Sequence, residues 1–190
     1  YWLGSLASYN VAQSPIVGGI IVAVLFSMFA AMPVNVIAIA VSIGLSGVAA
    51  GAATIGVCCS MVGFAVAGYS ENKIGGMLAI GFGTSMLEFP NILRRPLIWI
   101  PSIISAAILG PAGSALLHMS NSAAGAGAGS LILIGQFSTW HSMVPSTPGA
   151  IVIIEMVLMH FLLPGLISLS VSEVMRKLSW IKNGDMRLQA

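Results

Sequence analysis

Long apolar stretches, separated by a few short polar segments, dominate the chain. Residues 16–31, 34–70 and 96–154 contain no charged side chain. A membrane-spanning helix needs about 20 consecutive apolar residues, whereas transmembrane strands show segments of about ten residues that alternate in polarity. These stretches are longer and do not alternate. The pattern therefore predicts an all-α fold, a polytopic transmembrane helical bundle.

The apolar stretches divide into several predicted spans. The stretch 34–69 would form a helix of about 54 Å at 1.5 Å per residue, which exceeds the ~30 Å hydrocarbon core. We therefore expect it to break within the glycine- and alanine-rich residues 44–56, near the junction of about 34–47 with 52–69. The other predicted spans cover residues 16–32, 97–118 and 149–172.

Two further apolar segments, residues 75–89 and 121–137, are short and rich in glycine. We expect each to form a broken or re-entrant segment. Irregular backbone at membrane depth is tolerated only where protein or a water-filled cavity satisfies its N–H and C=O groups. A pair of short, interrupted segments in a transporter indicates the substrate site. The pattern thus points to a solute site between these two segments.

Composition supports lipid as the main solvent and narrows the classes of function. The chain is 57% hydrophobic and 6% charged, whereas soluble domains carry about 25% charged residues. Its net charge of +2 includes no basic stripe, so nucleic-acid binding is not expected. Cys58 and Cys59 are adjacent and the histidines are scattered, which predicts neither a metal site nor a cofactor. The sequence suggests no catalytic nucleophile, so we do not expect an enzyme.

The cationic residues orient the predicted spans. Arg94 and Arg95 share one loop, and Arg176 and Lys177 begin a basic tail. Both regions should face the cytoplasm, so residues 121–137 should enter and leave from the opposite side. We expect a permease-like domain over residues 1–172 and a polar cytoplasmic tail over residues 173–190.

Two sequence blocks resemble a known family. Residues 71–111, which include GFGTSMLEFPNILRRPLIWIP, and residues 125–137, GAGAGSLILIGQF, resemble the bacterial phosphotransferase-system EIIC-like proteins, PTS transporter subunit IIC of the EIIC type 2 group. The first block carries the stronger match, in Gly83, Thr84, Ser85, Met86, Leu87, Pro90, Asn91, Ile92, Pro96, Trp99, Ile100, Pro101, Ser105, Gly110 and Pro111. The chain departs from the family pattern at Glu88, Ala128 and Ser130, where Gln, Met and Thr are expected.

The resemblance implies a multi-pass permease of the bacterial inner membrane that moves a sugar or another small polar solute. It also implies that the chain corresponds to the C-terminal half of such a protein. Phosphorylated groups would reside on separate cytoplasmic EIIA and EIIB components. We further expect contact with membrane lipid and either a homo-oligomer or a missing N-terminal half.

The candidate solute-binding residues lie in or beside the two short segments: Thr84, Ser85, Glu88, Asn91, Ser130 and Gln136. Alternatives remain for several of them. Glu88 could pair with Arg94 or Arg95 instead of solute hydroxyls, Asn91 could cap a turn, and the hydroxyls of Thr84 and Ser85 could satisfy backbone freed by a helix break.

Glu155 is an isolated acid within an apolar span, and we consider it for proton coupling or as a residue at the membrane interface.

The main functional hypothesis is a solute permease with alternating access around the two short segments. The alternative is a membrane-embedded sensor or regulatory subunit that keeps the permease fold and binds a ligand without transport. Uptake of a labelled sugar would favour the permease, and tight binding of a sugar without flux would favour the sensor or regulatory subunit.

Overall fold

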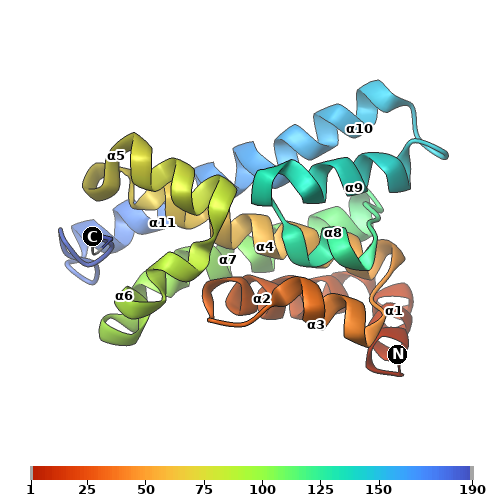
Figure 1. The fold of residues 1–190 in the computed structure, drawn as a ribbon, viewed down its shortest axis with the longest axis horizontal. Coiled ribbons are helices and arrows are strands. Elements are labelled where there is room, and N and C mark those ends of the chain that lie inside the picture. The colour runs from red at the N-terminus through yellow and green to blue at the C-terminus, as the bar shows by residue number, and fades with distance from the viewer. Residues whose placement is uncertain (1, 189–190) are drawn as a thin grey trace.

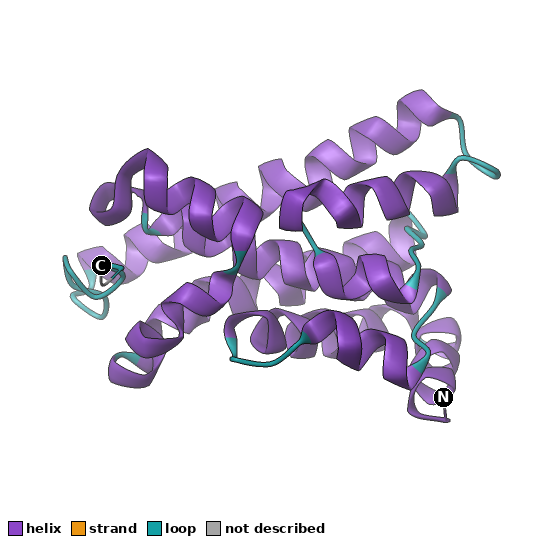
Figure 2. Ribbon diagram, in the orientation of Figure 1, coloured by secondary structure: helices purple, strands orange, loops and turns teal. Residues whose placement is uncertain are grey.

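The computed structural model describes residues 2–188, and every regular element in that range is helical (Figures 1 and 2). Three continuous helical stretches in this part of the chain are long and apolar enough to cross a membrane: Gly47–Ala67, Pro96–Leu116 and Gly149–Lys177. A shorter apolar helix, Pro15–Ala31, accompanies them. The predicted all-α transmembrane bundle is therefore confirmed.

Helix α4 (Gly47–Ala67) lies at the centre of the bundle, and nearly all of its residues are buried. It packs against α2 (Pro15–Ala31), α7 (Ile100–Pro111) and α11 (Leu163–Lys177). Small side chains permit this close packing: a Cβ added at Gly56 would lie 2.1 Å from the carbonyl oxygen of Ala23 on α2. Glycine and alanine at helix interfaces let backbones approach closely in membranes.

The N-terminal part of the chain folds beside α4. Helix α1 (Trp2–Gln13) packs on α2 and α4, and α3 (Val36–Ile43) begins after Asn35, whose side chain accepts a hydrogen bond from the backbone N–H of Ala38 at 3.0 Å. The chain breaks at Gly44, which adopts a left-handed conformation with φ of 71°. The prediction of a break was correct, but α4 already begins at Gly47 because its glycines and alanines pack inside the bundle.

The first broken segment enters from the left of Figure 1 and turns back near the middle of the molecule. The reversal occurs at Thr84, whose backbone is extended with φ of −158°. Pro90 then fits the first turn of α6, where its missing N–H leaves no intrahelical bond unmade. The segment comprises α5 (Tyr69–Leu78), the π-helical turn η1 (Ala79–Gly83), the 3₁₀ turn η2 (Ser85–Glu88) and α6 (Phe89–Arg94).

The second broken segment enters and leaves from the right of Figure 1. It reverses at Gly129, with φ of 52°, and continues through Ile132 and Leu133, which also have positive φ. Its elements are α8 (Ala123–Ala128), the 3₁₀ turn η5 (Leu131–Leu133) and α9 (Ile134–Met143). The two broken segments thus approach each other from opposite ends of the bundle.

The two remaining long stretches each contain a wide π-helical turn. One consists of the 3₁₀ turn η3 (Pro96–Trp99), α7 and η4 (Ala112–Leu116). The other consists of α10 (Gly149–Met156), η6 (Val157–Leu162) and α11. Each π-helical turn lies beside a proline, Pro111 or Pro164, which removes one backbone donor from the regular helical pattern.

Large apolar side chains cover the outside of α10, η6 and α11, which suits contact with lipid. The exposed ones include Ile151, Ile153, Ile154, Leu162 and Leu166.

Candidate functional site

The two broken segments touch at their points of reversal. Ser130, which follows Gly129 in the second segment, is fully buried, and its Oγ donates a hydrogen bond of 2.6 Å to the backbone oxygen of Gly81 in η1. The turns η1 and η5 pack against each other around this bond. The predicted residue Ser130 therefore joins the two segments.

A cavity of about 450 Å³ opens beside this junction. Both broken segments line it, together with the α2–α3 connection and α4. The lining residues are Ala30, Met32, Val34, Asn35, Val36, Ile37, Val57, Met61, Gly83, Thr84, Met86, Gly127, Ala128 and Leu131. Its volume falls within the range of about 300–1,000 Å³ that is common for small-molecule sites.

Two polar side chains reach this largely apolar cavity. The Thr84 hydroxyl accepts a hydrogen bond from the backbone N–H of Met86 at 3.2 Å and keeps its own proton as a donor. Asn35 uses its carbonyl oxygen to cap α3, which leaves its amide N–H groups as donors. A few placed polar groups in an apolar cavity are typical of sites that orient a small ligand.

Ser85 anchors the wall of the cavity without lining it. Its Oγ donates to the backbone oxygen of Ala30 on α2 at 2.8 Å and accepts from the Ser60 hydroxyl of α4 at 3.0 Å. Ser85 is fully buried. Of the two interpretations that the sequence left open, this geometry fits the one in which the hydroxyl satisfies backbone near a helix break.

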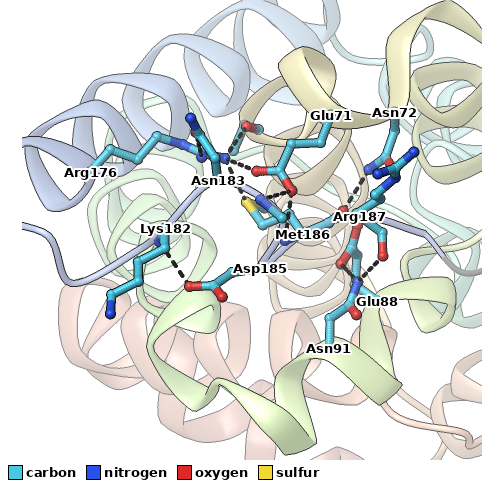
Figure 3. Close-up of polar contacts among 12 residues, drawn as sticks. Glu71, Asn72, Glu88, Asn91, Arg176, Lys182, Asn183, Asp185, Met186 and Arg187 are labelled. Atoms are coloured by element: carbon cyan, nitrogen blue, oxygen red, sulfur yellow. Dashed lines mark hydrogen bonds and ion pairs between the residues drawn. The ribbon is translucent and has the colours of Figure 1, made fainter.

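Glu88 and Asn91 lie away from this cavity, toward the arginine-rich end of the molecule. By this name we mean the end that carries Arg94, Arg95, Arg176 and Arg187. Asn91 Nδ2 donates 2.8 Å to Glu88 Oε2 and 3.1 Å to the backbone oxygen of Arg187 (Figure 3). Arg95 pairs with Asp185 at 3.6 Å.

The carboxyl of Glu88 is fully buried, and its Oε1 has no hydrogen-bond partner. Burial raises its pKa to about 7, the Asn91 hydrogen bond opposes this rise, and the charge of Glu71 adds to it. Glu88 lies outside the three stretches long enough to span a membrane. Burial thus brings the pKa of this carboxyl close to neutral pH.

Gln136, on α9, lies in a third environment, where its side chain faces η6 and α4. Its Nε2 is 3.3 Å from His160 Nδ1 and 3.6 Å from Cys58 Sγ, while Gln136 Oε1 and His160 Nε2 lack partners. Gln136 lines a separate apolar cavity of about 350 Å³. Sequence reasoning did not pair it with His160, because the two residues are far apart in the chain and no spacing connects them.

A second buried amide, missed in the sequence, fixes the second broken segment to α4. The two N–H groups of Asn121 Nδ2 are shared among three acceptors: Thr54 Oγ1 at 2.7 Å, Thr139 Oγ1 at 2.9 Å and the backbone oxygen of Gly135 at 3.2 Å. Such a satisfied network rigidifies its surroundings. Its only sequence signal was an asparagine preceding the glycine-rich segment.

Glu155 lies on α10, at the periphery of the bundle and apart from both cavities, and its Oε2 lacks a partner. Among the described residues, no group of three or more His, Cys, Asp or Glu side chains is arranged to hold a metal ion. The structure thus brings Thr84 and Ser130 to the junction of the broken segments, with Ser85 behind them, and separates Glu88, Asn91, Gln136 and Glu155 from it.

Comparison with known proteins gives one family. Neither the curated proteins nor the solved structures contain a match to the chain. The sequence model described as "Phosphotransferase system, EIIC" matches residues 1–188 of the 190 residues. This match extends far beyond the two blocks that carried the resemblance. The chain therefore belongs to the phosphotransferase-system EIIC family.

Proposed function

We propose that the chain is a permease subunit of the bacterial inner membrane that moves a sugar or another small polar solute, with the solute held in the cavity between the broken segments. Membership of the EIIC family and the apolar helices support a membrane transporter-like subunit. The observation that carries the finer proposal is the 450 Å³ cavity lined by residues of both broken segments.

The opposed arrangement of the two segments supports alternating access. One segment enters the bundle from each end, and the cavity lies where their reversals meet. Movement of either segment alone would open the cavity toward one end while the other segment stays closed. In this proposal Thr84 and Asn35 donate hydrogen bonds to solute hydroxyls, and Ser85 and Ser130 hold the two reversals in place.

The other candidate residues take secondary roles in the proposal. Gln136, with His160, would contact the solute only after it moves toward α9 and α10. Glu88 and Asn91 would act at the arginine-rich end, where EIIA and EIIB components would approach, and Glu155 remains a candidate for proton coupling. A homo-oligomer or a further part of the permease would cover the apolar faces together with lipid.

Uptake of a panel of labelled sugars into proteoliposomes tests the proposal. Thr84→Val keeps the side-chain shape but removes the hydroxyl. We expect it to lower uptake about tenfold, equivalent to about 1.4 kcal/mol. Thr84→Ser should retain most of the activity because it keeps the hydroxyl. Ser170→Ala, an exposed hydroxyl on α11, serves as the matched control and should transport normally.

Two results would overturn the proposal. Normal uptake by Thr84→Val would remove the cavity from the solute path. Saturable binding of a sugar without flux in the wild type would instead favour the sensor or regulatory function.

A further inference from the structure

The C-terminal segment, residues 182–188, folds back onto the first broken segment and is held there by side chains of α5 and α6 (Figure 3). These contacts join residues more than 90 positions apart in the chain.

Asn72 on α5 binds the backbone of this segment at two points. Its Nδ2 donates 2.6 Å to the backbone oxygen of Met186, and its Oδ1 accepts from the backbone N–H of Leu188 at 2.8 Å. One amide thus pairs with a C=O and an N–H of the same chain segment, in the way that strands pair in a sheet. Such backbone contacts provide affinity for a peptide segment without depending on its side chains.

Glu71, the neighbour of Asn72, adds a second set of backbone contacts. Its Oε2 accepts hydrogen bonds of 3.0 Å from the N–H groups of both Gly184 and Met186. Its Oε1 pairs with Arg176 on α11 at 2.7 Å, and both side chains are largely buried. Arg176 therefore holds the Glu71 carboxylate in position to bind the segment.

The segment also reaches α6 and the core. Asn91 donates 3.1 Å to the backbone oxygen of Arg187. The side chain of Met186 is completely buried in the cluster that contains Ile80 of η1 and Ile92 of α6. One short segment thereby connects the entry helix, the π-helical turn and the exit helix of the first broken segment.

The character of these contacts makes the segment displaceable. Apart from the buried Met186 and the partly buried Leu188, it is held by individual hydrogen bonds and by the Arg95–Asp185 ion pair. Lys182 and Arg187 have exposed side chains. Segments with few buried apolar contacts open with low free energy. The cavity wall formed by Gly83 and Thr84 lies in the loop whose two flanking helices this segment joins.

We propose that residues 184–188 form a latch that holds α5 and α6 together and keeps the first broken segment closed over the cavity. Release of the latch frees η1 and the Thr84 reversal to move, and so opens the cavity toward the arginine-rich end. The role of this opening in transport rests on the proposed function, whereas the control of access to the cavity by the latch does not.

The first experiment measures access to the cavity without measuring transport. The Thr84→Cys variant is labelled in membranes with a water-soluble maleimide. The native Cys58 and Cys59 are fully buried, so the reagent should react with the introduced thiol. Asn72→Ala and Asn72→Asp, which remove the contact with the Met186 oxygen, should each raise the labelling rate about tenfold. Ser70→Ala, an exposed neighbour on α5, should leave the rate unchanged. Equal rates in all four backgrounds would overturn the latch.

The second experiment fixes the latch in place. Arg95→Cys with Asp185→Cys replaces the ion pair between α6 and the segment and is joined by a short bis-methanethiosulfonate reagent. Crosslinking should lower sugar uptake at least tenfold, and a reductant should restore it. The control is a Lys177→Cys, Lys182→Cys pair. Its crosslink connects the end of α11 to the C-terminal segment and involves neither α5 nor α6, so this variant should transport normally.

The two experiments separate the possible failures. Full uptake by the crosslinked Arg95–Asp185 pair would overturn the latch. An absence of uptake in every variant, with labelling still faster in the Asn72 variants, would overturn the proposed function and leave the latch in place.

Discussion

At the scale of single residues, Glu88 shows how a local environment can redirect a sequence-based hypothesis. The sequence offered the solute or an arginine as its partner, whereas the structure places its carboxyl beside Asn91 and under the latch. Residues 88 and 91 are near neighbours, so their hydrogen bond was within reach of the sequence. The contact of Asn91 with the backbone of Arg187 could not be predicted, because no local pattern connects residues 91 and 187.

Glu88 should make docking of the latch depend on pH. Its pKa is raised from an ordinary value of 4.5 to about 7 in the folded chain, mainly by burial. We expect release of the latch to hydrate the carboxyl and lower this pKa, so the docked state binds the proton more tightly. Docking should therefore be strongest below about pH 4.5 and should weaken as pH rises through about 7. The nearby charge that contributes is Glu71 on α5, which is paired with Arg176 on α11.

Pulsed EPR between spin labels at Ile74→Cys and Lys182→Cys, both exposed positions, measures the docked fraction. Glu88→Gln should stay docked from pH 5 to pH 8, while Glu173→Gln, an exposed acid on α11, should behave as the wild type does. A wild-type docked fraction that is constant over this range would contradict the prediction.

At the scale of elements, glycine spacing predicted which segments break but placed one break wrongly. Residues 75–89 and 121–137 do reverse direction, and their glycines lie near the reversals. In α4 the same residue type has the opposite effect, because glycine there permits close helix packing rather than a turn. Composition cannot separate these two uses of glycine, since the difference lies in the neighbouring helices.

A matched pair of substitutions tests this distinction. Gly56→Ala places a methyl group against the Ala23 carbonyl, whereas a Cβ at Gly75 on α5 meets nothing within 4 Å. We expect Gly56→Ala to lower the free energy of unfolding by about 1–3 kcal/mol. Gly75→Ala should be neutral or slightly stabilising, because alanine is a better helix former. Thermal unfolding in detergent measures both, and equal melting temperatures would show that α4 tolerates wider spacing.

At the scale of the whole molecule, the fold class followed from the sequence more directly than the site did. The lengths of the apolar stretches were enough to predict an all-α transmembrane bundle. The sequence block that resembles the family also contained Thr84, which lies on one wall of the cavity. The facing wall, which includes Asn35, comes from the α2–α3 connection and carried no motif. Residues from distant segments meet only through packing around α4, which is why Gln136 was grouped with Thr84 in the sequence but lies in another cavity.

The burial of α4 has a consequence for how the protein enters the membrane. In its most apolar 18-residue window 94% of the residues are buried, against 28% for the Gly149–Lys177 stretch. The helix is suited to contact with neighbouring helices rather than with lipid, since glycine, alanine, serine and cysteine supply little of the favourable transfer free energy that leucine and isoleucine supply.

Insertion of α4 into the membrane should therefore depend on the helices that precede it. In a glycosylation-mapping assay, α4 alone should insert inefficiently, and placing residues 1–46 before it should raise the inserted fraction. Correct insertion of this protein would then depend on the spanning helix that is most deeply buried in the finished fold.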